Sequence, residues 1–513
     1  MDHLLLGLAA NPALPPLLLG RLVDRLVGSG PGPDEADGDT DGAAEVAVVL
    51  AERPDLGRAH AAALTAAYGE DVAVPLAERG LLAPADVDPA AWPLAALALL
   101  RRGTAPGAWA RALAMAPEPR HRALAAAEPA ALTADAVELL AADPDPEVVS
   151  ELALEAGPEL AARLARHPHA EVRLAVAHNR ATPPPVLRAL LTGDGLPAAR
   201  ACLVCDREPV PFSHDPQCGR VDCELPADAA CDGTHQSTGH RIRQAALGNP
   251  ATPGEAAARF ADSPSMLLRW SLAGHPGLPQ AAYARLAADP VPGIRQELAG
   301  NPGVGTDVLR VLCADTVPEV RRAAVHHPGL PPEVVAALAR SPQAGLRGFL
   351  AQRRDLPDAV REALADDPDA SVAARAAAHP GLSEARLRSL LDRFGDQVAA
   401  GVAANPDAPA ALLEELAERP NPPRKALRAI AVHPRATARA LRACLADHRA
   451  RRPAAGRPEL PVPDLLRLLT DPDPQVVEAA AANPALPPGV MAALVAGAAP
   501  AEAAGNTDAP GVG

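Results

Sequence analysis

The stretch DPVPGIRQELAGNPGVGTDVLRVLCADTVPEVRRAAVHHP, residues 289–328, decides the fold of this chain. Its opening Asp289-Pro290 is typical of a helix start, because an aspartate oxygen caps free backbone N–H groups and proline is preset for the first helical position. We therefore expect a helix over 290–300, a turn at Asn301-Pro302 and a second helix over 306–314. Two short helices joined by a turn form one structural unit.

The same pattern recurs along most of the 513 residues. The turn position returns every 26 residues, at Asn249, His275, Asn301, His327, His379 and Asn405, with Arg353 in the same register. A helix-start position lies 12 residues before each of these turns from His275 to His379, at Ser263, Asp289, Asp315, Ser341 and Asp367. With irregular spacing, the turn position extends to Asn11, Arg53, Arg79, Asn179, His433, Arg457 and Asn483.

A single unit of this size cannot bury its apolar stripe, so neighbouring units must stack to form one continuous core. The sequence therefore predicts an all-α solenoid of roughly 18 helix-pair repeats. Segments of the form Asp-Pro-x-Pro-x-Val/Ile-Arg followed by Ala-x-Asn-Pro-x-x-Pro resemble the leucine-rich repeat variant family and, more loosely, HEAT-type repeats. This resemblance implies a right-handed superhelix of short α and 3₁₀ helices without strands. The units here are slightly longer than is usual for that family, which leaves room for two α-helices per unit.

Composition and charge limit the possible partners and compartments. The chain is 48% hydrophobic but only 2% aromatic, which suits close packing of Ala, Leu and Val between helices. A net charge of −15 argues against nucleic acid and other acidic partners, because a phosphate-binding surface needs an excess of Lys and Arg. No stretch approaches 18 uninterrupted apolar residues, so we expect no membrane-spanning helix. These features, with a poor match to a signal peptide, predict a cytoplasmic protein.

Two recurrent polar residue types require an interpretation. An arginine follows the helix start by six residues, at Arg173, Arg200, Arg243, Arg269, Arg295, Arg321 and Arg347. It lies within the apolar stripe, so we interpret it as a packing residue whose guanidinium binds neighbouring carbonyls or Asp289-type caps, rather than as a ladder for an acidic ligand. The histidines at the turn position, such as His275 and His327, replace Asn of other units and are interpreted as turn residues rather than catalytic bases.

The cysteines point to specific chemistry. Five of the seven follow the pattern C-x2-C-x12-C-x4-C-x7-C, at Cys202, Cys205, Cys218, Cys223 and Cys231. In a reducing compartment such a cluster indicates metal ligands more than disulfides. We expect four of these five to bind one metal ion or cluster, with His214 and His235 as possible substitutes. The remaining Cys313 and Cys444 lie on apolar helical stretches and are expected in the core.

The repeat register places this cluster within the array. Because Arg200 aligns with Arg173, Cys202 and Cys205 are expected at the end of an ordinary first helix, on the side facing away from its apolar stripe. Residues 206–236 are then an insertion at one turn. The expected organisation is 1–205, N-terminal repeats with a disordered acidic loop at 28–42; 206–236, the Cys-rich insertion; 237–496, C-terminal repeats; and 497–513, a disordered tail.

The spacing leaves zinc and an iron–sulfur cluster open, because four thiolates suit both. Two resemblances favour iron. Some leucine-rich repeat variant proteins carry a four-cysteine iron–sulfur cluster, and Cys231-Asp-Gly-Thr-His235 is similar to the CDGSH motif, in which the Cys and the His ligate a [2Fe–2S] cluster.

No catalytic motif or nucleotide-binding fingerprint is found, so no catalytic residue and no organic cofactor site are predicted. The sequence favours a non-enzymatic scaffold for protein–protein interaction with a structural metal site. The alternative is an iron–sulfur protein for electron transfer or redox sensing, with the repeats as its docking surface. The sequence does not identify a protein partner.

Overall fold

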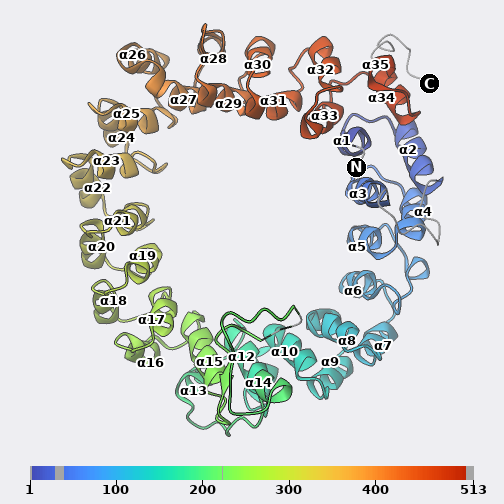
Figure 1. Ribbon diagram of the computed structural model, residues 1–513, viewed down its shortest axis with the longest axis vertical. Coiled ribbons are helices and arrows are strands. Elements are labelled where there is room, and N and C mark those ends of the chain that lie inside the picture. Colours follow the sequence, from blue (N-terminus) through green and yellow to red (C-terminus); the bar gives the residue numbers. More distant parts are fainter. Residues whose placement is uncertain (1–2, 29–39, 222, 224, 504–513) are drawn as a thin grey trace. The chain divides into compact units, whose positions relative to one another are not determined.

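The computed structural model describes residues 3–28, 40–221, 223 and 225–503, and shows short α-helices that follow one another in pairs (Figure 1). The chain forms two compact units, one of residues 1–87 with 336–513 and one of residues 88–335. Most of the predicted acidic loop, and the end of the predicted tail, lie outside the described residues. None of the described helices combines the length and apolar character that crossing a membrane requires.

The first compact unit contains helices from both ends of the chain. Its elements are α1 (His3–Ala10), α2 (Pro16–Gly28), α3 (Thr40–Ala51), α4 (Arg58–Tyr68), α5 (Glu70–Glu78), the 3₁₀ helix η1 (Pro84–Asp86), α23 (Ala344–Leu350), α24 (Asp358–Ala365), α25 (Ala370–Ala377), α26 (Glu384–Phe394), α27 (Asp396–Ala404), α28 (Ala410–Ala417), α29 (Arg424–Val432), α30 (Ala438–Cys444), α31 (His448–Ala455), α32 (Val462–Leu468), α33 (Pro474–Ala481), α34 (Pro488–Val495) and α35 (Pro500–Ala503). Part of the predicted tail is thus helical, at α35.

The second compact unit contains the Cys-rich segment. Its elements are α6 (Pro93–Arg101), α7 (Ala108–Ala114), α8 (Pro119–Ala126), η2 (Pro129–Ala131), α9 (Ala134–Ala141), α10 (Pro146–Glu155), α11 (Pro158–Leu164), α12 (Ala170–His178), α13 (Pro184–Thr192), α14 (Leu203–Arg207), β1 (Phe212–Ser213), β2 (Ala230–Cys231), α15 (Gln236–Gly248), α16 (Gly254–Ala257), η3 (Ala258–Phe260), α17 (Met266–Ala273), α18 (Gln280–Leu286), α19 (Pro292–Gly300), α20 (Thr306–Cys313), α21 (Pro318–Val325) and α22 (Pro332–Ala339), which crosses the boundary between the units.

The expected pair of α-helices per repeat is confirmed at α19 and α20. The Asp289 carboxylate accepts a hydrogen bond of 2.9 Å from the Val291 N–H just before α19 begins. First helices of successive repeats pack against one another, as α19 does against α17 and α21. Within the described residues only three short 3₁₀ segments occur, so the 3₁₀ layer implied by the family resemblance is not seen. The longer units have room for a second α-helix in its place.

The turn position forms a ladder of hydrogen bonds between repeats. The Asn301 amide nitrogen donates to the carbonyl oxygens of Ala273, at 2.6 Å, and His275, at 2.8 Å. The Asn301 side-chain oxygen accepts from the Gly303 N–H at 2.9 Å. One repeat further along, His327 Nε2 donates to the Asn301 carbonyl at 2.9 Å. The interpretation of these residues as turn residues is confirmed, and they also tie each repeat to the preceding one.

The recurrent arginines bind caps and carbonyls, as predicted. Arg295 donates from Nε and Nη2 to the Asp315 carboxylate at 2.7 and 2.9 Å, and from Nη1 to the Asp289 carbonyl at 2.7 Å. This guanidinium lowers the pKa of Asp315. The same contacts join Arg269 to Asp289, and Arg347 to Asp367. Arg200 and Arg243 depart from the pattern and are exposed.

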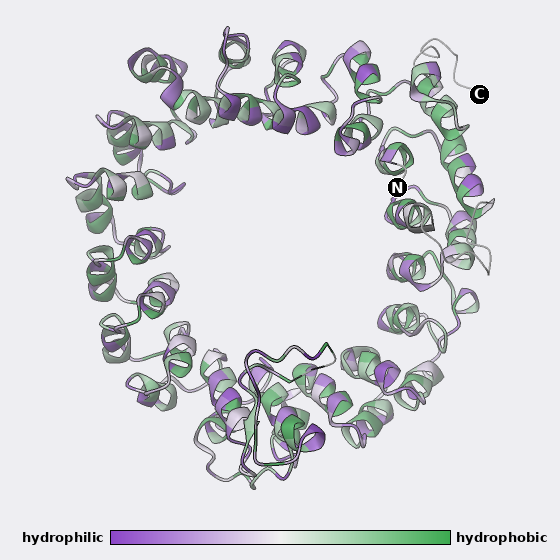
Figure 2. Ribbon diagram, viewed as in Figure 1, coloured by the Kyte–Doolittle hydropathy of each residue, from purple (hydrophilic) through white to green (hydrophobic). Residues whose placement is uncertain are grey.

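Within each compact unit the core is a layer of small and branched apolar side chains. Helices expose one polar stripe and bury one apolar stripe, so hydrophilic and hydrophobic colours alternate along them (Figure 2). Cys313 is 6% exposed and Cys444 is fully buried, which confirms their expected place in the core. Burial raises the pKa of the Cys444 thiol to about 12, so this thiol stays protonated.

The two ends of the chain stack on each other within the first compact unit. The Asn11 amide nitrogen donates to the carbonyls of Ala481 and Asn483, both at 2.8 Å, which is the ladder contact made elsewhere between consecutive repeats. α1 packs directly on α33, and Gly7 permits the close approach, because a Cβ at that position would lie 2.3 Å from the Glu478 carbonyl oxygen. The first repeat therefore continues the array from the last one.

Candidate metal centre

The Cys-rich insertion is longer than the sequence predicts. α13 ends at Thr192 and α15 begins at Gln236, so residues 193–235 lie outside the helix pairs instead of residues 206–236. The array continues behind the insertion, because the Asn249 amide donates to the carbonyls of Ala177 and Asn179 at 3.0 and 2.9 Å. The insertion therefore projects from two repeats that are in direct contact.

The helix expected to carry the cysteine pair does not form. Gly193 and Gly195 both have left-handed backbone conformations, with φ of 81° and 76°, which end α13 and prevent the next helix from starting on schedule. The chain then runs extended along the array, where the Arg200 N–H donates to the Pro168 carbonyl at 2.8 Å. The cysteine pair consequently lies at α14, a helix of five residues.

Cys202 directly precedes α14, and Cys205 lies within it. Cys202 is fully buried and Cys205 is half-buried. Their expected orientation, away from the apolar stripe of a repeat helix, stays a prediction, because that helix does not form. Cys202 has an extended backbone just before α14, and its sulfur lies 3.4 Å from that of Cys205, close enough for the two thiols to share one ion.

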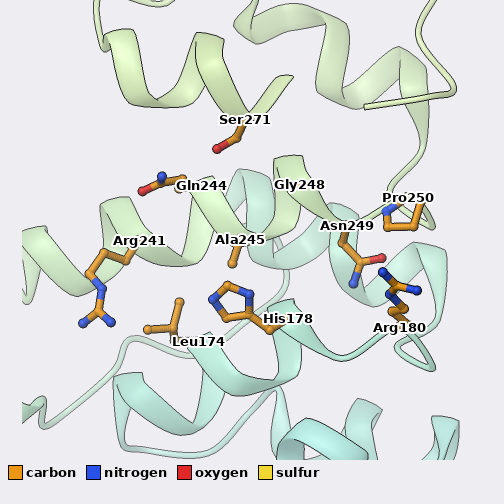
Figure 3. A pocket seen from close by; sticks show the side chains of 10 residues that line it. All are labelled: Leu174, His178, Arg180, Arg241, Gln244, Ala245, Gly248, Asn249, Pro250 and Ser271. Atoms are coloured by element: carbon orange, nitrogen blue, oxygen red, sulfur yellow. The ribbon is translucent and has the colours of Figure 1, made fainter. Parts of the chain in front are cut away.

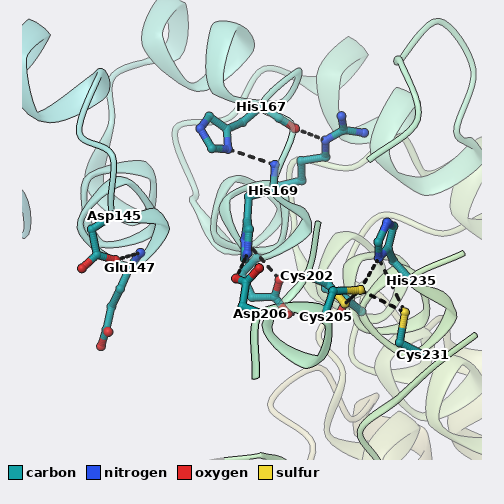
Figure 4. A network of polar contacts seen from close by, with 12 residues as sticks. Asp145, Glu147, His167, His169, Cys202, Cys205, Asp206, Cys231 and His235 are labelled. Carbon is teal, nitrogen blue, oxygen red and sulfur yellow. Dashed lines mark hydrogen bonds and ion pairs between the residues drawn. The ribbon is translucent and has the colours of Figure 1, made fainter. Parts of the chain in front are cut away.

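Three thiols and one imidazole converge in the insertion (Figure 4). Cys205 Sγ lies 3.4 Å from the sulfurs of Cys202 and Cys231 and 3.4 Å from His235 Nδ1. Cys231 Sγ lies 3.7 Å from the same imidazole nitrogen. All four ligand atoms are within 4.8 Å of one another. The four residues, here called the Cys3His cluster, could hold a metal ion.

A tight turn joins the last two members of the Cys3His cluster. Asp232 accepts hydrogen bonds from the Thr234 N–H and hydroxyl at 2.9 and 2.6 Å, and the Gly233 N–H points at Cys231 Sγ at 3.3 Å. His235 has a left-handed backbone with φ of 58°, an uncommon conformation for a residue with a side chain. This turn aims Cys231 and His235 at the same point just before α15 starts.

The thiols of the Cys3His cluster do not ionise independently. Burial, followed by the neighbouring thiols of Cys231 and Cys202, raises the pKa of Cys205 to about 12. Burial also raises the pKa of Cys202. At Cys231 burial acts in the same direction, but the Gly233 N–H and further hydrogen bonds outweigh it and lower the pKa. Three thiolates cannot coexist here without a compensating positive charge, which a bound cation would supply.

A polar network connects the Cys3His cluster to the repeats (Figure 4). His169, at the start of α12, lies with Nε2 2.7 Å from the carboxylate of Asp206, the residue after Cys205. Its Nδ1 lies 3.3 Å from the Glu171 carboxylate, which in turn accepts a hydrogen bond of 3.0 Å from the Thr238 hydroxyl of α15. The network fixes α14 against two repeat helices.

The other two predicted cysteines lie in a separate group. Cys218 and Cys223 come together with His214, and their ligand atoms are also within 4.8 Å of one another. The seven candidate ligands named from the sequence fall into these two groups, whereas four of the five cysteines were expected at one site. His235 is a ligand candidate in place of a fourth cysteine, and its position after Cys231 in the CDGSH-like segment was the signal for it.

A polar groove of about 510 Å³ lies next to the insertion, across α12, α15 and α17 (Figure 3). Arg241 and Arg180 lie at its two ends, with His178 and Gln244 between them. Burial, and then the Arg241 charge, lower the pKa of His178. Among the described residues no carboxylate pairs with either arginine. Sequence reasoning missed this groove, because residues 178–180 and 241–244 meet only through the skipped insertion.

The paired helices and the hydrogen-bond ladder define an all-α helical-repeat protein. Among solved structures, the chain is similar to a leucine-rich repeat variant with a novel repetitive structural motif, at 21% identity, covering 49% of this chain and 87% of that one with a TM-score of 0.29. It is also similar to an engineered protein from the Northeast Structural Genomics Consortium, at 20% identity, covering 94% and 93% of the two chains with a TM-score of 0.13. No protein-family model and no curated protein matches it.

Proposed function

We propose that the protein is a non-enzymatic, cytoplasmic repeat scaffold for protein–protein interaction, stapled by a structural zinc ion in the Cys3His cluster. The observation that carries the proposal is the convergence of four ligand atoms within 4.8 Å at a mostly buried position in the insertion. The reducing compartment keeps the thiols available to a metal ion.

The distances favour a single ion over an iron–sulfur cluster. Tetrahedral zinc with Zn–S bonds of about 2.3 Å places neighbouring thiolates about 3.8 Å apart. The corresponding separations in the Cys3His cluster are 3.4 Å between sulfurs and 3.4 and 3.7 Å between sulfur and nitrogen. In a cluster the ligands bind different iron atoms and are spread around an iron–sulfide core. Separations this short suit ligands of a single ion.

The ligand set favours a structural role. Four protein ligands complete the tetrahedron of a zinc ion, whereas catalytic zinc sites keep one position for water or substrate. Cys202, Cys231 and His235 are all at least 92% buried, because their exposed fractions are 0%, 1% and 8%. The ion would link α14, β2 and the start of α15, and so would close the insertion at its base.

The groove between Arg180 and Arg241 is the docking position that we propose for the partner. Although the chain carries a net charge of −15, this groove presents two guanidinium groups that no described carboxylate neutralises. Such a surface suits an acidic peptide segment, because charge-assisted hydrogen bonds to Arg are favourable. The overall charge thus does not represent this local surface.

Metal content and absorbance of the full chain, purified with and without oxygen, test the metal assignment. We expect a colourless protein that contains zinc by elemental mass spectrometry. A brown protein with absorbance near 400 nm that dithionite bleaches would instead establish the iron–sulfur alternative, with electron transfer or redox sensing as its function.

Binding of a fluorescent oligo-glutamate peptide tests the docking groove. We expect salt-dependent binding to the full chain that weakens at least tenfold in the double variant Arg180→Glu with Arg241→Glu. The matched control is Arg188→Glu with Arg322→Glu, which makes the same charge change at exposed residues of α13 and α21 outside the groove. Equal losses in the double variant and the control would show a non-specific charge effect and contradict the assignment.

A further inference from the structure

The group of His214, Cys218 and Cys223 lies outside the Cys3His cluster, and the proposed zinc staple makes no use of it. His214 Nε2 lies 3.1 Å from Cys223 Sγ, and the ligand atoms of all three residues are within 4.8 Å of one another. All three side chains are half-buried. We call these residues the Cys2His cluster.

Local backbone contacts hold each member of the Cys2His cluster in place. β1 pairs with β2 in antiparallel register, and the His214 N–H extends this pairing with a bond of 2.8 Å to the Ala229 carbonyl. A turn fixes Cys218, whose N–H donates to the Asp215 carbonyl at 2.9 Å. The Cys223 N–H donates to the Arg220 carbonyl at 3.3 Å in a second turn. The convergence therefore depends on three separate backbone features.

The His214 ring lacks a partner that its environment should supply. Its Nε2 faces a thiol, while its Nδ1 is buried without a hydrogen bond. Buried polar atoms are nearly always satisfied, so an isolated one requires an explanation. The segment between β1 and β2 also has few apolar residues with which to offset the entropy of ordering. A bound cation would account for both the converging thiols and the turns that hold Cys218 and Cys223.

We propose that the Cys2His cluster binds a second divalent metal ion of the zinc class, separate from the ion of the zinc staple. Two thiolates and an imidazole select a borderline or soft cation such as Zn²⁺, Co²⁺ or Cd²⁺ over Mg²⁺ or Ca²⁺. The fourth position of a tetrahedron is left to solvent. The insertion is then a two-metal segment in which β1 and β2 lie between the ions.

The two sites differ in strength for structural reasons. The Cys2His cluster offers one ligand fewer than the Cys3His cluster, and its side chains are more exposed than those of Cys202 and Cys231. A chelator reaches an exposed ion more readily, and an ion with three protein ligands is released more easily. The second ion is therefore the one that a moderate chelator removes first.

Metal stoichiometry of full-length variants tests this inference. The chain is reconstituted with Zn²⁺ or Co²⁺, and bound metal is counted by native mass spectrometry, with helicity measured by circular dichroism to show that each variant is folded. We expect two ions in the unmodified chain and one ion in each of two double variants, Cys218→Ser with Cys223→Ser and Cys202→Ser with Cys205→Ser. Cys313→Ala, a change at a buried cysteine outside both clusters, should retain two ions.

The Co²⁺ spectra distinguish the ligand sets independently of the count. In Cys202→Ser with Cys205→Ser, the remaining Co²⁺ lies in the Cys2His cluster and has two thiolate ligands. In Cys218→Ser with Cys223→Ser, it lies in the Cys3His cluster and has three. We therefore expect a weaker thiolate-to-cobalt charge-transfer band in the first variant than in the second.

The possible outcomes separate this inference from the proposed zinc staple. One ion that is lost with Cys202→Ser and Cys205→Ser, but retained with Cys218→Ser and Cys223→Ser, would overturn the second site and leave the staple intact. One ion that both double variants abolish would mean a single shared ion, which would also overturn it. A chain that binds no metal would contradict both.

Discussion

At the scale of single residues, the turn position of the repeat is occupied by Asn, His or Arg, and all three side chains make the same kind of contact. Asn301, His327 and Arg53 each donate to a carbonyl of the preceding repeat, with Arg53 bonding Ala9 and Asn11 at 2.8 and 2.7 Å. The spacing identified this position and its role as a turn. It could not show the bonds between repeats, because those depend on the stacking distance rather than on any local pattern.

His275 should make the array sensitive to mild acid. Its Nε2 donates to the Thr252 carbonyl at 3.0 Å, and its Nδ1 accepts from the Gly277 N–H at 3.1 Å, so the folded ring is neutral. Burial lowers the pKa of His275 below its usual 6.5. A lowered folded pKa gives stability that is complete above pH 6.5 and is lost as the pH falls towards the folded pKa. Each tenfold difference in proton affinity between the unfolded and the folded ring corresponds to about 1.4 kcal/mol.

The variant His275→Asn should remove this acid sensitivity and keep the ladder, because Asn301 makes the equivalent bonds in the next repeat. Hydrogen exchange in α17 and α19 between pH 7.5 and 5 measures the effect locally. We expect protection to fall with acid in the unmodified chain and to fall less in the variant. Identical pH profiles would refute the assignment of the sensitivity to His275.

At the scale of elements, the sequence predicted ordinary repeats well and the insertion only in part. The helix pair at α19 and α20 follows from caps, prolines and apolar spacing, all of which are local. The insertion was predicted less well. The position of Arg200 matched the repeat spacing and so predicted a helix there, but the left-handed backbone at Gly193 and Gly195 ends the helical pattern before Arg200. The division of the ligands into two clusters depends on the pairing of β1 with β2, a contact between segments that repeat periodicity does not encode.

The zinc staple should control the insertion and leave the repeats nearly unaffected. In Cys202→Ser with Cys205→Ser we expect rapid proteolysis within residues 193–235, with helicity almost unchanged, because Asn249 joins the flanking repeats directly. Limited proteolysis followed by mass spectrometry locates the cuts. Loss of most helicity would show that the metal holds the array together, contrary to the nearest-neighbour energetics of a repeat protein.

At the scale of the whole molecule, the array uses its own first repeat to cover its last one. Terminal repeats of a solenoid normally need a polar outer face. Here the end is covered instead, because Leu5 and Leu8 of α1 are buried and α1 packs on α33. Arg25 adds a bond of 2.9 Å to the Val495 carbonyl at α34. Local patterns predict the individual repeats at both ends, but nothing in them indicates that the ends meet.

The variant Gly7→Ala should weaken the packing of α1 on α33, here called the joint. The added Cβ would lie 2.3 Å from the Glu478 carbonyl oxygen and 2.7 Å from the Ala481 Cβ, so α1 must shift away from α33. The control Gly300→Ala places the same methyl group in open space at the end of α19, where Ala should stabilise the helix by about 0.5–1 kcal/mol. Hydrogen exchange should rise in α1 and α33 for Gly7→Ala alone. Equal exchange in both variants would contradict the joint.

The joint between α1 and α33 also has a consequence for how the protein is made. α33 leaves the ribosome more than 460 residues after α1, because α1 ends at Ala10 and α33 begins at Pro474. At bacterial and eukaryotic speeds of about 5–20 residues per second, the leucines of α1 wait roughly half a minute to a minute and a half for their partner. During that interval the apolar side of α1 stays uncovered on the nascent chain. A chaperone, or a second copy of the chain made from the same message, can bind it.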